Sequence, residues 1–340
     1  MNHSGLVEKL ISAIGEDYVH TAHEAMRTYD HDALMIYKGE PGVVVLPDST
    51  EDVRQVMTIC HEAGVPVIAR GAGTCLSGGA TPAPGGVLLV TTRMNRILEV
   101  DYENMLARVQ PGVVNLHLSN ETRPNGFHYA PDPSSQMACT IGGNAAENSG
   151  GAHCLKYGMT TNHIMGMTVV LSSGEVVELG ADGEEVPGFD LRGFFVGSEG
   201  TFALTTEITV RLVPNPEGVR TMLTTFSNVG DACRTVSDII AAGAVPAAME
   251  LMDRYTVEAI EKVMKAGYPQ DAAAVLLIEL DGLVPSMRSL EKIVRQFSEE
   301  NKCTSFRLAE NEEEREALWM GRKKAFGAFG AIAPAYYCLD

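Results

Sequence analysis

The chain has 340 residues, of which 45% are hydrophobic and 21% are charged. These values are typical of a soluble globular protein and exclude a disordered chain, a coiled coil and a collagen-like fibre. Its 26 Lys and Arg residues and 44 Asp and Glu residues give a formal net charge of −18, which argues against general binding to nucleic acid and against docking on anionic lipid through a basic patch.

The sequence also lacks signals for export, membrane insertion and disulfide formation. The first twenty residues do not read as a secretory signal, because they contain Glu8 and Asp17 and no basic start before an apolar run. No run of about 18 apolar residues occurs, so no membrane span is expected. The seven cysteines contain no CxxC pair, so neither a disulfide framework nor an iron–sulfur ligand set is expected. A cytoplasmic location is therefore predicted.

The N-terminal part predicts a helical segment followed by a β-α-β unit. Residues 1–37 are expected to be mostly helical, since Leu6, Leu10 and Ile14 recur at helical spacing. The apolar run 43–46 predicts a strand. A helix capped by Ser49 or Thr50 then buries Val53, Val56, Met57 and Cys60 and ends at Gly64 in a left-handed conformation. Residues 65–69 predict a buried strand.

Shorter elements follow, and Pro214 to Pro216 marks the expected domain boundary. Before it, the sequence predicts strands over 87–91, 97–100, 107–109 and 202–213, a helix over 113–122, and a hairpin of 169–171 with 176–179. Beyond it, strands and helices alternate up to a last helix over 312–327, which predicts an α+β or α/β domain with one layer of helices on a sheet. The apolar segment 335–340 reads as the start of a strand, so this domain is expected to be incomplete.

A glycine-rich loop over residues 70–79, RGAGTCLSGG, follows the predicted strand 65–69. It does not fit the dinucleotide fingerprint, because Leu76 stands where the third glycine belongs and no good helix follows. It retains what a pyrophosphate needs, namely glycines, consecutive backbone N–H donors and the hydroxyls of Thr74 and Ser77. The alternative is an ordinary tight turn between strands.

Two further stretches of small residues occur downstream. The first, over 131–151, contains PDPSS and TIGGN and lets a flat ligand lie against backbone; the alternative is a flexible surface loop. The second, GSEGT over 197–201, forms a turn before a strand, and alone it would be a plain strand entry.

Together, these stretches in this order resemble the FAD-binding domain of the vanillyl-alcohol-oxidase (PCMH) superfamily. The resemblance is strongest to its FAD-linked 2-hydroxyacid dehydrogenases, a group that contains D-lactate and D-2-hydroxyglutarate dehydrogenases and the flavin subunits of glycolate oxidases. It implies an α+β protein with a two-lobed FAD-binding domain over 38–215, with lobes of about 38–100 and 101–215. An incomplete substrate or cap domain over 216–340 would follow.

The resemblance also implies cofactor-binding roles. The first loop is expected to bind the pyrophosphate, and the other stretches to line the flavin and its ribityl chain. The residues assigned to FAD in this way are Arg70, Gly71, Ala72, Gly73, Thr74, Ser77, Gly78, Pro131, Asp132, Ser135, Thr140, Gly142, Gly143, Asn148, Ser149, Glu199, Gly200, Thr201 and Ile208. Some relatives attach FAD through a histidine in the first loop; Thr74 occupies the matching place here, so noncovalent FAD is expected.

On the substrate side, residues 318–324 resemble the segment in which the group places a carboxylate-binding arginine, best matched by Arg322. A guanidinium holds a carboxylate through two hydrogen bonds. The alternative is a solvated basic end of a helix. The catalytic base and the His-rich ligands of a divalent metal are expected beyond Asp340, so no catalytic or metal-binding residue is assigned within this chain.

The function implied is FAD-dependent oxidation of a small 2-hydroxy acid, such as glycolate or D-lactate, to the 2-oxo acid by hydride transfer to flavin N5. Electrons would pass to an iron–sulfur partner subunit or another acceptor, and partners could attach the chain to the inner face of the membrane. Two alternatives stay open: a flavin-binding fragment without turnover, and the same scaffold acting on a different alcohol or an ether lipid.

Overall fold

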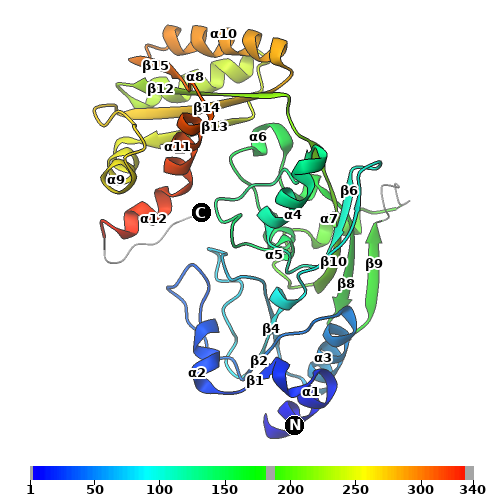
Figure 1. Cartoon of the computed structure of the whole chain (residues 1–340). Coiled ribbons are helices and arrows are strands. Elements are labelled where there is room, and N and C mark those ends of the chain that lie inside the picture. The colour runs from blue at the N-terminus through cyan, green and yellow to red at the C-terminus, as the bar shows by residue number, and fades with distance from the viewer. Residues whose placement is uncertain (1–2, 181–187, 334–340) are drawn as a thin grey trace. The chain divides into compact units, whose positions relative to one another are not determined.

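The computed structural model of the chain describes residues 3–180 and 188–333 and contains both helices and sheets (Figure 1). These residues divide into two compact units. Unit 1 holds residues 3–150 and 159–214, and unit 2 holds residues 151–158 and the described residues from 215 onward. Segment 151–158 thus belongs to unit 2 although the chain on both sides of it belongs to unit 1. Residues 335–340, which were expected to begin a strand, lie outside the described residues.

The first sheet of unit 1 has four strands in the order β1-β2-β4-β3. Its strands are β1 (Val19–His20), β2 (Val43–Val45), β4 (Val87–Val90) and β3 (Val67–Arg70). Strands β2, β3 and β4 run parallel, and helix α3 (Thr50–Ala63) connects β2 to β3, so the predicted β-α-β unit is confirmed. The expectation of a buried second strand over 65–69 is wrong, because β3 forms the edge of the sheet and all its residues are half-buried.

The sequence signals for α3 are confirmed. The Ser49 side chain accepts a hydrogen bond from the backbone N–H of Asp52 at 3.1 Å, which satisfies one of the free donors at the start of the helix. Gly64 ends the helix with a φ of 65°. The buried face consists of Val53, Val56, Met57 and Cys60. Of the N-terminal residues expected to be mostly helical, α1 (His3–Ile14) packs on α3, whereas residues 30–40 form no helix.

The second sheet of unit 1 has five antiparallel strands in the order β5-β6-β10-β8-β9. Its strands are β5 (Ile97–Asp101), β6 (Leu106–Val109), β10 (Ala203–Arg211), β8 (Ile164–Leu171) and β9 (Val176–Gly180). The predicted hairpin and long strand are therefore confirmed. The other elements of unit 1 are α2 (His23–Met26), α4 (Asn115–Thr122), α5 (Ile141–Glu147), α7 (Leu191–Phe195), five short 3-10 helices, and the paired strands β7 (Phe127–His128) and β11 (Val213–Pro214).

The glycine-rich stretch after residue 131 contains two short helices that the sequence did not predict. Helix α5 begins after Thr140 and buries Ile141, Asn144 and Ala145, although two of its seven residues are glycines with low helix propensity. Helix α6 (Cys154–Tyr157) follows in segment 151–158 and so belongs to unit 2. The alternative of a flexible surface loop is therefore wrong for this stretch.

Unit 2 is built on an antiparallel sheet in the order β13-β14-β12-β15. Its strands are β13 (Ala248–Asp253), β14 (Ala274–Gly282), β12 (Gly218–Phe226) and β15 (Ser305–Leu308). Its helices, besides α6, are α8 (Val229–Ala241), α9 (Arg254–Met264), α10 (Val284–Glu300), α11 (Glu312–Lys323) and α12 (Ala325–Gly330). The helix predicted over 312–327 is thus divided at Lys324.

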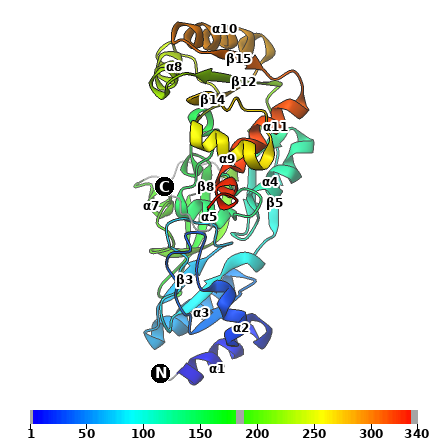
Figure 2. The same cartoon turned by 90° about the vertical axis from the view of Figure 1, so that its left-hand side faces the viewer.

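Helices cover both faces of this sheet (Figure 2), so the expectation of a single helical layer is wrong. Strand β14 explains the difference, because all its residues from Ala274 to Leu280 are buried. Ala274, Leu276, Ile278 and Leu280 contact the core beneath α8 and α10, whereas Val275 and Leu277 face α9 and α11. A strand that is covered on both sides has no alternating polar face.

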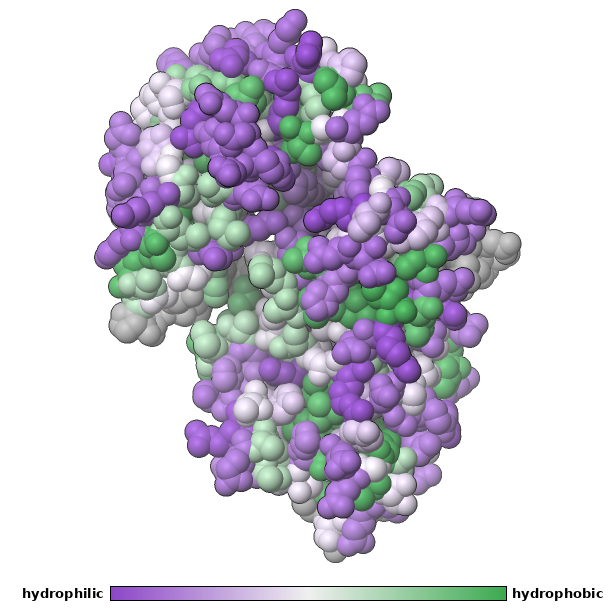
Figure 3. Space-filling model, viewed as in Figure 1, coloured by the Kyte–Doolittle hydropathy of each residue, from purple (hydrophilic) through white to green (hydrophobic). Residues whose placement is uncertain are grey.

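The face of the molecule shown in Figure 3 is mostly hydrophilic, in line with the net charge of −18. Among the described residues, no helix combines the length and the apolar character that crossing a bilayer requires.

Candidate functional site

The loop after β3 presents backbone donors that have no partner within the described part of the chain. The N–H groups of Ala72, Gly73 and Thr74 make no hydrogen bond there. Gly73 has a φ of 73°, a left-handed conformation that glycine adopts without strain. Successive N–H groups in such a turn form a concave site for an anion.

The second glycine-rich stretch contacts this loop through the start of α5. Thr140 Oγ1 accepts a hydrogen bond from the backbone N–H of Gly143 at 3.1 Å and so caps the helix. A Cβ atom on Gly71 would lie 2.5 Å from the same Thr140 Oγ1. The two stretches are therefore in van der Waals contact, and the contact requires a glycine at position 71.

The third stretch is hydrogen-bonded to the other end of α5. The backbone N–H of Gly197 donates to the carbonyl of Ala145 at 2.8 Å, and that of Glu199 donates to the carbonyl of Ala146 at 2.9 Å. A Cβ on Gly200 would lie 3.0 Å from the Cβ of Ala69, at the end of β3. All three stretches therefore meet around α5 and the end of β3.

Two carboxylates lie where the stretches meet. A Cβ on Gly79 would be 2.7 Å from Glu199 Oε2 and 3.6 Å from Glu147 Oε1. Ser77 Oγ donates to Glu147 Oε2 at 3.2 Å. Burial raises the pKa of Glu147, and the nearby charge of Glu199 raises it further.

Residues 29–39 pack against the first loop, and no pattern in the sequence predicts this contact. Arg70 Nη1 donates to the carbonyl of His31 at 2.8 Å, and Cys75 Sγ donates to Oδ2 of the buried Asp32 at 3.1 Å. Burial, followed by the bond to Asp32, raises the pKa of Cys75 to about 12, so this thiol is not a nucleophile at neutral pH. No local periodicity marks these contacts, because they join residues 39 and 43 positions apart.

Several other residues assigned to FAD make local hydrogen bonds. The Pro131 carbonyl accepts from Asn115 Nδ2 at 2.9 Å. Asn148 Oδ1 accepts from the N–H of Thr161 at 2.9 Å, and the Ser149 carbonyl accepts from Thr160 Oγ1 at 2.7 Å.

Three more assigned residues are placed by turns and by the sheet. Thr201 Oγ1 donates to the Ser198 carbonyl at 2.6 Å, and the Ser135 carbonyl accepts from the N–H groups of Ala138 and Cys139. Ile208 is fully buried in the middle of β10, where it pairs with Val109 and Met167. Its side chain therefore belongs to the core of unit 1.

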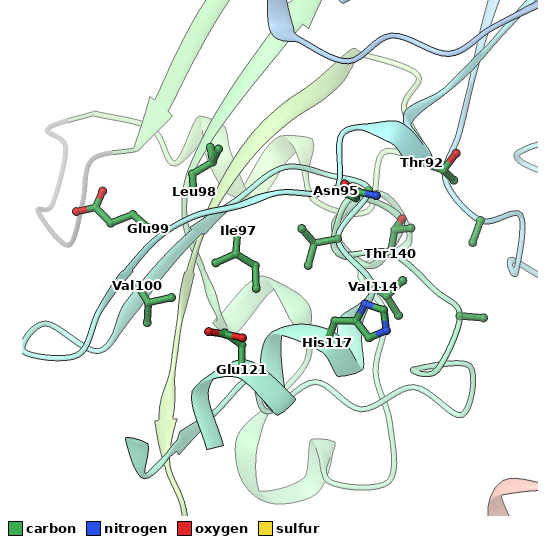
Figure 4. Close-up of a pocket in the computed structure, with 14 residues that line it drawn as sticks. Thr92, Asn95, Ile97, Leu98, Glu99, Val100, Val114, His117, Glu121 and Thr140 are labelled. Carbon is green, nitrogen blue, oxygen red and sulfur yellow. The ribbon is translucent and has the colours of Figure 1, made fainter. Parts of the chain in front are cut away.

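A cavity of about 690 Å³ adjoins the first two stretches (Figure 4). Ala72, Ala138 and Thr140 of these stretches line it, together with residues of β5, the turn 112–114, α4 and the segment 92–95 before β5. His117 and Glu121, one turn apart on α4, project toward it. Its volume lies within the range of small-molecule sites.

Arg322 lies in unit 2, near the end of α11. Its Nε donates to Glu250 Oε2, on β13, at 2.7 Å. Among the described residues, no group of three His, Cys, Asp or Glu side chains is placed to hold a metal ion. The metal ligands expected beyond Asp340 stay a prediction.

Family models match most of this chain. One described as an FAD binding domain matches residues 41–180, and one described as the C-terminal domain of FAD linked oxidases matches residues 215–340. Among solved structures, alkyldihydroxyacetonephosphate synthase matches with a TM-score of 0.82 at 20% identity, over 98% of this chain and 66% of that one. At this identity the likeness concerns the fold alone, a PCMH-type FAD-binding domain followed by an FAD-oxidase C-terminal domain.

Curated relatives are closer in sequence. The glycolate oxidase subunit GlcD of Escherichia coli strain K12 is 47% identical over 326 residues, which cover 96% of this chain and 65% of that protein. The subunit of the same name from Bacillus subtilis strain 168 is 42% identical over 335 residues, or 98% and 71% of the two chains. The chain therefore belongs to the family of FAD-linked oxidases that contains the glycolate oxidase subunit GlcD. It spans about two thirds of the length of these relatives.

Proposed function

We propose that the three glycine-rich stretches of unit 1 bind FAD without a covalent link. The observation that carries this proposal is the row of N–H groups at Ala72, Gly73 and Thr74, which have no partner among the residues that the structure describes and which suit a pyrophosphate. The glycines support it, because they bring backbone rather than side chains close to a ligand. Thr74 has no ring nitrogen to which a flavin could be attached.

We further propose that the whole protein oxidises a small 2-hydroxy acid, glycolate or a D-lactate-like compound, to the 2-oxo acid. Bound FAD would supply the acceptor for the hydride that leaves C2 of the substrate. Unit 2 would serve as the substrate domain, with Arg322 binding the carboxylate and so fixing the position of C2. The base that receives the hydroxyl proton is expected beyond Asp340, and the proposal assigns it to no residue here.

The partner is proposed from the word subunit in the names of the relatives. An iron–sulfur subunit is the expected electron acceptor, and a cytoplasmic location stays the expectation. The partner is tested by isolating the protein with its partners from the native cell and measuring iron and acid-labile sulfide in the complex, and the location by following the protein through cell fractionation.

The visible spectrum of the purified protein, before and after acid precipitation, tests the cofactor. We expect a flavin spectrum and yellow colour that is released into the supernatant. Colour retained in the pellet would contradict the noncovalent link. A protein that remains colourless and does not bind added FAD would contradict FAD binding itself.

Reduction of a dye by glycolate and D-lactate tests the substrate class. We expect Arg322→Ala to raise the KM of the full-length protein at least tenfold, since a charge-assisted bidentate contact contributes about 1.5–3 kcal/mol. Lys323→Ala, which removes the neighbouring cation on the same helix, is the matched control. An unchanged KM in the Arg322 variant would reject its carboxylate role. Equal activity of this 340-residue chain and a longer one would contradict a base beyond Asp340.

A further inference from the structure

Within residues 3–180 and 188–333, the Arg322 guanidinium makes a side-chain hydrogen bond through Nε alone. Nε donates to Glu250 Oε2 at 2.7 Å, and neither Nη1 nor Nη2 makes a hydrogen bond to another described residue. The Arg322 side chain is 35% exposed, whereas that of Glu250 is 17% exposed. The guanidinium is therefore anchored through Nε, and within the described part of the chain its two terminal nitrogens remain available to bind a ligand.

The C-terminal half of α11, which carries Arg322, is hydrogen-bonded to and packed against its surroundings. The Tyr268 hydroxyl donates to the Leu318 carbonyl, and Trp319 Nε1 donates to the carboxylate of Glu279. A Cβ on Gly321 would lie 2.8 Å from the Cβ of Ala266, so the helix backbone approaches the loop after α9 as closely as a glycine allows.

Glu250 is itself on a rigid support. It lies on β13, opposite Leu277 of β14, and on the sheet face of Ala248 and Met252, which belong to the core beneath α9 and α11. Arg322 is thus attached to the packed helix α11 and Glu250 to the paired strand β13. The positions of these two elements together determine the orientation of the guanidinium.

We propose that Glu250 is a positioning residue that orients Arg322 so that Nη1 and Nη2 together receive a substrate carboxylate. This inference rests on the proposed role of Arg322. Binding both oxygens of a carboxylate requires the planar donors in one orientation, and a flexible arginine would lose conformational entropy on binding. A bond to Nε leaves the two terminal nitrogens available for the ligand.

Two measurements test this proposal. The first is the ¹⁵N–¹H NMR signal of Arg322 Nε in the FAD-loaded chain, assigned with Arg322→Lys. It should be protected from solvent exchange in the native protein, retained in part in Glu250→Gln and lost in Glu250→Ala. The second is the KM for glycolate of the full-length protein, which should rise about threefold in Glu250→Gln and about tenfold or more in Glu250→Ala, with FAD affinity unchanged.

Glu291→Ala is the matched control. It removes an ion pair of the same kind, Arg220 Nη1 to Glu291 Oε2 at 2.5 Å, with side chains 30% and 19% exposed, on other elements of unit 2. It should change neither readout. An unchanged KM in Glu250→Ala would overturn the inference. A lower KM would overturn it too, because Glu250 would then compete with the substrate carboxylate for the Arg322 guanidinium. If Arg322→Ala also leaves KM unchanged, the proposed function fails instead.

Discussion

At the scale of single residues, the conformation of the first loop requires a glycine at position 73. Its φ is 73°, and a Cβ there would overlap the Arg70 guanidinium. Gly73→Ala should therefore strain the backbone by about 1 kcal/mol, displace Arg70 and weaken FAD binding at least tenfold. Fluorescence titration of the apoprotein with FAD measures this.

Gly85→Ala is the control for that variant. Gly85 has a similar φ of 71°, but nothing lies within 4 Å of a Cβ there. The Gly85→Ala variant should lose a similar amount of folding stability as Gly73→Ala, but its affinity for FAD should stay that of the native protein. Equal FAD affinities of the two alanine variants would show that the geometry of the loop at Gly73 does not matter for the cofactor.

The residues that sequence reasoning missed share one property. Each is hydrogen-bonded to a residue that is distant in the chain. Asp32 accepts from Cys75, 43 positions away, and Glu250 accepts from Arg322, 72 positions away. Glu279 accepts from Trp319, 40 positions away. Local spacing carries no information about such pairs. The glycines at 71, 73 and 200 could be assigned because their motifs are short and contiguous.

At the scale of elements, the cap of α5 offers a comparison with that of α3. Thr140 and Ser49 make the same kind of bond, each at 3.1 Å, to the N–H three residues on. Thr140→Ala and Ser49→Ala should each destabilise unit 1 by about 1 kcal/mol. Only Thr140→Ala should also weaken FAD binding, because α5 contacts the first loop and the third stretch.

Thermal unfolding and FAD titration of both variants test this expectation, and Thr140→Ser, which keeps the hydroxyl, should restore the affinity. If Ser49→Ala loses as much affinity for FAD as Thr140→Ala, general destabilisation of unit 1, rather than the position of α5, weakens FAD binding.

The elements predicted correctly are those whose signals agree with one another. Helix α3 has a cap, an apolar face and a terminal glycine, and each favours the same boundaries. Helix α5 was missed because its glycines and its buried Asn144 are untypical of a helix; contacts with the rest of unit 1 stabilise it. The two-sided burial of β14 was missed although its uninterrupted apolar run indicates it.

At the scale of the whole molecule, Glu279 links segment 151–158 to the sheet of unit 2. Glu279 is only 4% exposed, and its carboxylate accepts from Thr221 Oγ1 at 2.6 Å and from Trp319 Nε1 and lies 3.1 Å from His153 Nε2. Burial alone would raise the pKa of Glu279, but the bonds from His153 and Thr221 and the charge of His153 outweigh it, so that the pKa is lowered.

A lowered pKa means that the folded state favours the charged form, so this stabilisation is present above the unfolded pKa of about 4.3 and is lost as the pH falls through the folded value. Glu279→Gln should therefore cost about 2–3 kcal/mol at pH 7, since it weakens a buried charged network. The difference from the native protein should shrink below about pH 4.

Each unit has its own hydrophobic core, so calorimetry should resolve two unfolding transitions. Glu279→Gln should lower only the transition of unit 2, and added FAD should raise that of unit 1, because ligands stabilise the state that binds them. Ser49→Ala provides the reciprocal control by lowering the transition of unit 1. One transition that moves as a whole in every case would show that the two units unfold together.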